Sequence, residues 1–81
     1  MSYTLEFECS SGWNGSVKIY VHLSSDARKT RNYTTTSGSN LMRAIIDILN
    51  NKPVLFFHAT TLSFNLAKDE YDFINILLDL S

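Results

Sequence analysis

Two segments near the start of the chain alternate apolar and polar side chains residue by residue, and this feature constrains the fold most. The apolar members are Tyr3, Leu5, Phe7 and Cys9 in the first segment and Val17, Ile19, Val21 and Leu23 in the second. Successive side chains of a β-strand point to opposite faces, so a period of two predicts two half-buried strands. The linking stretch at residues 10–16, SSGWNGS, is rich in turn-forming residues and predicts a hairpin.

The parity of this alternation predicts the register of the hairpin. A two-residue turn would pair Phe7 with His22 and set an apolar face against a polar face, which the side-chain period disfavours. A three-residue turn at residues 13–15 instead pairs Phe7 with Val21. Its last residue is a glycine, which readily adopts the left-handed backbone that such a turn requires. We therefore expect Trp13 at the exposed tip of the turn.

The rest of the chain predicts three more strands and two helices. The expected elements are a polar loop at 24–30, a third strand at 31–36, a helix at 40–50, short strands at 54–57 and 62–65, and a helix at 66–80. Ser39 is the expected N-cap of the first helix, while Asn51 and Pro53 mark its end. The order β-β-β-α-β-β-α predicts a single α+β domain over residues 1–81. We expect a mostly antiparallel sheet with both helices packed on one face.

The composition narrows the classes of partner and compartment. The 81 residues carry a formal net charge of −1, which gives no overall attraction to nucleic acid or to a membrane. Cys9 is the single cysteine, so no disulfide forms within the chain, as is usual in a reducing compartment. The sequence begins without a basic and apolar signal, and no apolar run approaches about 18 residues. We expect a cytoplasmic protein without membrane contact, located in the host cytoplasm if the source is a virus.

No group of side chains has the spacing of a catalytic, metal or cofactor site. Cys9 and His22 are expected on opposite faces of the hairpin, too far apart to act as nucleophile and base. His58 has no second ligand at the spacing of a metal site. The acidic residues within 69–72 lack the pattern of a calcium loop and suit the start of a helix. We therefore expect no enzyme activity, no metal and no small-molecule cofactor.

Two features indicate a protein partner. Trp13, beside Asn14, stands in the predicted turn, and tryptophan is strongly enriched at interface hot spots. The alternative is that Trp13 folds back over the sheet edge as a local lid. The last helix has a wider apolar arc than one sheet face needs, so another element, a second copy or a partner must cover the excess. We expect self-association through Phe73, Ile76 and Leu80.

Three cations cluster in the middle of the chain, at Arg28, Lys29 and Arg31, shortly before Tyr33. Such a group is an ordinary solvated loop, a contact for an acidic protein surface, or, beside an aromatic ring, a contact for nucleic acid.

The sequence predicts a non-catalytic protein-binding module that inhibits a partner by occluding or bridging it. A phage-type inhibitor of a bacterial defence or host enzyme is the favoured class. The predicted partner-binding residues are Trp13, Asn14, Arg28, Lys29 and Arg31. The alternative is a small nucleic-acid-binding regulator that uses the basic loop at 28–31.

Overall fold

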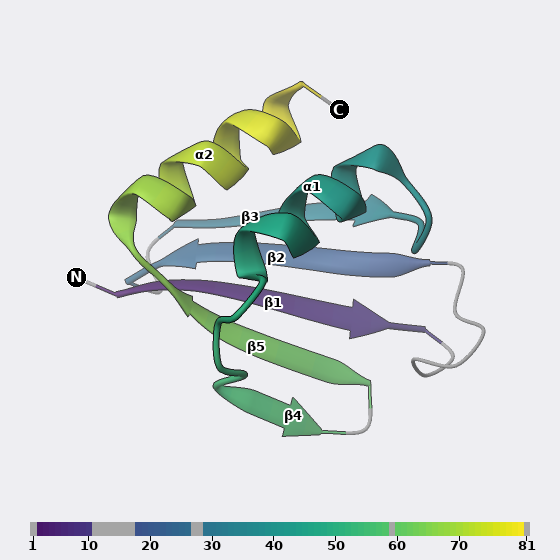
Figure 1. The fold of residues 1–81 in the computed structure, drawn as a ribbon, viewed down its shortest axis with the longest axis horizontal. Helices are drawn as coiled ribbons and strands as arrows, with labels where there is room; N and C mark the ends of the chain where they lie inside the picture. Colours follow the sequence, from purple (N-terminus) through teal and green to yellow (C-terminus); the bar gives the residue numbers. More distant parts are fainter. Residues whose placement is uncertain (1, 11–17, 27–28, 59, 81) are drawn as a thin grey trace.

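A computed structural model describes residues 2–10, 18–26, 29–58 and 60–80 (Figure 1). Its elements are β1 (Tyr3–Cys9), β2 (Ile19–Ser25), β3 (Lys29–Thr35), α1 (Asn40–Leu49), β4 (Phe56–His58), β5 (Thr61–Leu66) and α2 (Lys68–Asp79). This order confirms the predicted succession of strands and helices. In the part of the chain that the structure describes, neither helix has the length and apolar character needed to cross a bilayer.

The five strands form one sheet in the order β3-β2-β1-β5-β4, and every neighbouring pair is antiparallel. β1 lies at the centre of the sheet. Phe7 stands opposite Val21 on β2 and opposite Leu62 on β5. The predicted hairpin register is therefore confirmed, whereas its turn, with Trp13 and Asn14, lies outside the described residues.

The two faces of the sheet differ in character, because both helices cover the same face (Figure 1). That face holds the core residues of the strands: Leu5, Phe7, Cys9, Ile19, Val21, Leu23, Phe64 and Leu66. On the opposite face, His22 Nδ1 lies 2.6 Å from Asn32 Oδ1 across the β2–β3 ladder. Cys9 and His22 are thus on opposite faces, as the alternation predicts.

Helix α1 begins and ends where the sequence predicts. Ser39 Oγ accepts a hydrogen bond of 3.1 Å from the backbone N–H of Met42, which caps the first turn. The helix buries Met42, Ile45 and Leu49 against the sheet. Just beyond its end, Asn51 adopts a positive φ of 72°, the left-handed conformation that commonly follows a helix.

Helix α2 begins without a side-chain cap, since Ala67 occupies the N-cap position. Glu70 partly compensates, because its Oε1 accepts a hydrogen bond of 2.8 Å from the backbone N–H of Ala67. The helix buries Tyr71, Ile74 and Leu78. The Tyr71 ring packs on the ring of Tyr3, with 4.9 Å between their centroids.

Three sequence-based boundaries are wrong. The helix predicted to begin at 66 begins at Lys68, because Leu66 pairs with Tyr3 as the last residue of β5. The predicted polar loop at 24–30 is shorter, because β2 continues to Ser25 and β3 already begins at Lys29. Polar and charged residues at the start of β3 belong to the β2–β3 ladder, because their backbone pairs with β2. This pairing outweighs the low strand propensity of the side chains. The predicted strand at 54–57 instead spans Phe56–His58, so His58 belongs to this strand. Val54 and Leu55, which were predicted in this strand, lie in the segment between α1 and β4.

Candidate protein-interaction surfaces

An open apolar groove lies between α1, the inner face of β5 and the segment that leaves α1. Its volume is about 470 Å³. The apolar lining consists of Phe7, Ile19, Met42, Ile46, Leu49, Val54, Leu62 and Phe64. Asn50, Asn51 and Lys52 also line it, at the end of the helix. We call this feature the α1–β5 groove; it has the size of a pocket that accepts a drug-sized molecule or a few side chains.

The local sequence explains why this groove is open. Ile46 lies outside the core stripe of α1 and is 53% exposed, although it borders the buried Leu49. After α1, the left-handed Asn51 and the rigid Pro53 turn the chain before it enters β4. Val54 therefore stands at the wall of the groove and remains exposed. The two exposed residues make the rim apolar.

A second apolar surface lies on the outer side of α2. Phe73, Ile76 and Leu80 are all more than half exposed, and Leu80 reaches 80%. We call these three residues the α2 stripe. They are spaced by three and four positions, so they fall on one side of a helix. The core residues of α2, Tyr71, Ile74 and Leu78, point to the sheet instead. The α2 stripe agrees with the exposed apolar arc that the sequence predicts.

The two surfaces are separated by α1, which lies between α2 and the β5–β4 edge of the sheet (Figure 1). The exposed polar residues of α1, Asn40, Arg43 and Asp47, alternate along it with the buried ones. The α1–β5 groove and the α2 stripe are therefore distinct surfaces, and one can be altered without the other.

Most of the charged residues beside the α2 stripe are paired within the chain. Lys68 Nζ lies 2.7 Å from Asp72 Oδ2, and this hydrogen bond raises the pKa of Lys68. Lys52 Nζ lies 2.8 Å from Glu70 Oε1. The hydrogen bond from Lys52 lowers the pKa of Glu70, more strongly than burial raises it. These pairs compensate Asp72 and Glu70, whereas Asp69, exposed four positions before Phe73, has no charged partner among the described residues.

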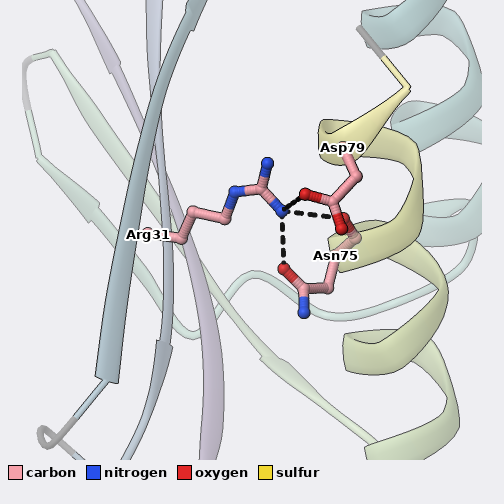
Figure 2. A network of polar contacts seen from close by, with 3 residues as sticks. All are labelled: Arg31, Asn75 and Asp79. Atoms are coloured by element: carbon pink, nitrogen blue, oxygen red, sulfur yellow. Dashed lines mark hydrogen bonds and ion pairs between the residues drawn. The ribbon is translucent and has the colours of Figure 1, made fainter.

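Arg31 belongs to a third such pair, shown in Figure 2. Its Nη1 lies 2.6 Å from Asp79 Oδ1, and it donates to Asn75 at the backbone oxygen (3.0 Å) and at Oδ1 (2.9 Å). Figure 2 shows the side chain extending from β3 to the last turns of α2. The guanidinium therefore joins the sheet edge to α2, and its charge is compensated inside the molecule.

The other predicted contact residues fall in different places. Lys29 is exposed at the start of β3, while Arg28, Trp13 and Asn14 lie outside the described residues. Of the two described cations of the basic cluster, Arg31 is thus engaged by α2, whereas Lys29 is exposed. Among the described residues, no three potential ligands of the His, Cys, Asp or Glu type gather as a metal site requires.

Comparison with known proteins gives no family for the chain. No family model matches it, no curated protein has a similar sequence, and no solved structure matches its fold. The function of the two surfaces must therefore be inferred from their own chemistry.

Sequence reasoning missed the α1–β5 groove. Its lining comes from five separate parts of the chain, so no local pattern contains it. One signal was present, since Ile46 is a large apolar residue that stands outside the apolar face of its own helix. A large apolar side chain in that position commonly marks a contact surface when others lie beside it.

Proposed function

We propose that this protein is a non-catalytic protein-binding module that occludes or bridges a partner through the α1–β5 groove. The observation that supports this most is the open apolar groove of about 470 Å³ with Ile46 and Val54 exposed at its rim. Contiguous exposed apolar surface is costly in water and typically marks a binding site. A partner removes this surface from water by inserting one or two bulky apolar side chains.

The surroundings of the groove fit the anatomy of a protein interface. Such interfaces have an apolar centre and a polar rim that makes hydrogen bonds. Here Asn50, Asn51 and Lys52 form one end of an otherwise apolar lining. The module then acts by covering a surface of its partner. The specific form that we propose is an inhibitor of a bacterial defence or host enzyme, of the kind phages encode.

The nucleic-acid alternative has less support. It relied on three neighbouring cations, and Arg31 is compensated by Asp79 and held by Asn75. A phosphate ligand would have to compete with a carboxylate already in contact with the guanidinium. The remaining described cation of this group, Lys29, is a single exposed charge.

The test is affinity capture from a nuclease-treated lysate of the source cells with tagged protein. We expect one protein to be retained by the wild type and by Ile76→Glu, but lost with Ile46→Glu. The two isoleucines are matched, because both lie in helices and are 53% and 55% exposed. Trp13→Ala in the same experiment tests the predicted turn contact.

The retained protein is then purified and titrated calorimetrically against each variant at low and high salt. An apolar interface predicts a negative heat-capacity change and little dependence on salt. Equal affinity for wild type and Ile46→Glu would refute binding at the groove. Capture that requires intact nucleic acid would support the nucleic-acid alternative.

A further inference from the structure

We infer that the α2 stripe is a self-association surface, on which the α2 helix of a second copy packs in antiparallel orientation. This inference goes beyond the proposed function and does not depend on it. The stripe lies on another side of the helical layer from the α1–β5 groove. Its partner is a second copy of this protein, whereas the proposed partner of the groove is a different protein.

The spacing of the stripe suits packing against another helix. Phe73, Ile76 and Leu80 occupy positions i, i+3 and i+7, the spacing by which one helix face docks along another. Leu77, half-buried beside them at i+4, widens the surface toward the core. Exposing these side chains does not serve the fold, because α2 already buries a separate set of residues against the sheet.

The charges beside the α2 stripe favour a second copy over a strongly charged partner. Asp72 is paired with Lys68, and Asp79 is paired with Arg31, so neither carboxylate stands alone beside the stripe. The uncompensated acid beside the stripe, among the described residues, is Asp69, which is exposed at its N-terminal end. From Asp72 to Leu80 the stripe is apolar and the charges at its sides are compensated, so this part of the surface is complementary to itself. A basic helix would find one uncompensated acid here, Asp69, whereas an identical antiparallel helix brings its Asp72 and Asp79 to this surface together with their cations, Lys68 and Arg31.

The antiparallel orientation follows from the residues at the two ends. A two-fold axis beside Ile76 places Phe73 of each copy near Leu80 of the other, so the aromatic ring covers the most exposed leucine. It also separates Asp69 from its own copy, whereas a parallel arrangement would place the two carboxylates side by side. Antiparallel helix dipoles add a favourable contribution.

Figure 1 shows α1 between α2 and the β5–β4 edge of the sheet. The dimer therefore leaves the α1–β5 groove, which is lined by α1 and β5, open on each copy. Two identical grooves related by a two-fold axis would let one dimer engage two copies of a partner. If the two partner copies are themselves joined, as in a dimeric partner, occupying both grooves at once increases the apparent affinity without any new contact.

The first test is sedimentation equilibrium of the purified protein over a wide concentration range. We expect a species of twice the 9.2 kDa chain mass. Ile76→Glu should raise the dimer dissociation constant about a hundredfold, because the symmetric interface loses the contact twice. Ile46→Glu, at equal exposure on α1, should leave that constant within about twofold, since it lies on the other surface.

The second test is disulfide formation in air by Ile76→Cys, which a two-fold axis beside this residue brings into range of its copy. Ile46→Cys is the control and should stay uncrosslinked. Circular dichroism of every variant shows that it is folded. A wild type that remains monomeric at all concentrations overturns the inference. So does a dimer that survives Ile76→Glu or is lost with Ile46→Glu. Loss of partner binding alone, with the dimer intact, concerns only the proposed function.

Discussion

The two helices pack on the same face of one sheet, yet they use their apolar residues differently. Helix α1 buries Met42, Ile45 and Leu49, and Ile46 is its one large apolar residue that is mostly exposed. Helix α2 also buries three residues, Tyr71, Ile74 and Leu78. In addition, the three residues of the α2 stripe are exposed. The core therefore accounts for nearly all of the apolar residues of α1, and for only half of those of α2. The apolar side chains that the core does not bury are the candidates for binding.

The same contrast appears at the helix starts. Ser39 gives α1 a side-chain cap, whereas Ala67 gives α2 none. Besides the local bond from the Ala67 N–H to Glu70, helix α2 has contacts from elsewhere, through Lys52 to Glu70 and through Arg31 to Asn75 and Asp79. Local sequence thus fixes α1, and tertiary contacts hold α2.

The largest expected effect separates two isoleucines of α2. Ile74 is fully buried and Ile76 is 55% exposed, two positions away. Ile74→Ala should lower the free energy of unfolding by about 2–4 kcal/mol, because it leaves a cavity in the core. Ile76→Ala should change it by less than about 0.5 kcal/mol. Urea denaturation at a concentration where the protein is monomeric measures both. Equal losses would mean that the α2 stripe serves the fold.

The Arg31 contacts come next. Arg31→Ala should lower the free energy of unfolding by about 1 kcal/mol, because β3 and α2 lose their shared hydrogen bonds and Asp79 is largely exposed to solvent. Lys29→Ala, at an exposed position of the same strand, should have almost no effect. Chemical denaturation compares the two. The same Arg31 variant should also weaken the dimer in sedimentation, since Asp79 then adds an unpaired charge beside the α2 stripe.

The caps predict changes of opposite sign in the two helices. Ser39→Ala should destabilise the protein by about 1 kcal/mol, because the Met42 N–H loses its acceptor. Ala67→Ser should stabilise it by about 0.5 kcal/mol, since Ala67 is exposed, has an extended backbone and already receives Glu70 in half of a capping box. Thermal unfolding of both variants checks the pair. An unchanged stability of Ala67→Ser would show that α2 gains nothing from a side-chain cap.

The smallest effect concerns pH. The pKa of Glu70 is lowered from its ordinary value of 4.5 in the folded protein, chiefly by the hydrogen bond from Lys52. Its carboxylate therefore stabilises the fold above that ordinary value, and the contribution disappears as the pH falls through the lowered pKa. Glu70→Gln should cost about 0.5 kcal/mol at neutral pH. Below the lowered pKa its stability should converge with that of the wild type, as urea titrations across this range would measure.

Features that depend on neighbouring residues were predictable from the sequence. The hairpin register follows from side-chain alternation, which only one parity satisfies, and the structure pairs Cys9 with Ile19 accordingly. Ser39 and Asn51 were predictable as helix boundaries because capping is a local interaction. The exposed apolar side of α2 was predictable as well, because the helical period alone shows which residues share a side of the helix.

Features that depend on distant residues were not predictable. Arg31 resembles an exposed loop cation until Asn75 and Asp79, far along the chain, come to lie beside it. Its role arises only when α2 crosses the sheet. The α1–β5 groove has the same origin, because Phe7 and Leu62 meet in it only through the pairing of β1 with β5.

The central place of β1 has a consequence for how the chain can be divided. β1 pairs on one side with β2, the next strand in the sequence. On the other side it pairs with β5, which lies near the C-terminal end of the sequence. A break in the segment between α1 and β4 would leave one fragment with an open β1 edge and the other with a matching open β5 edge. Open edges of this kind readily take up a strand of suitable pattern. The two fragments should therefore reassemble when mixed, which makes this fold a natural scaffold for a split reporter.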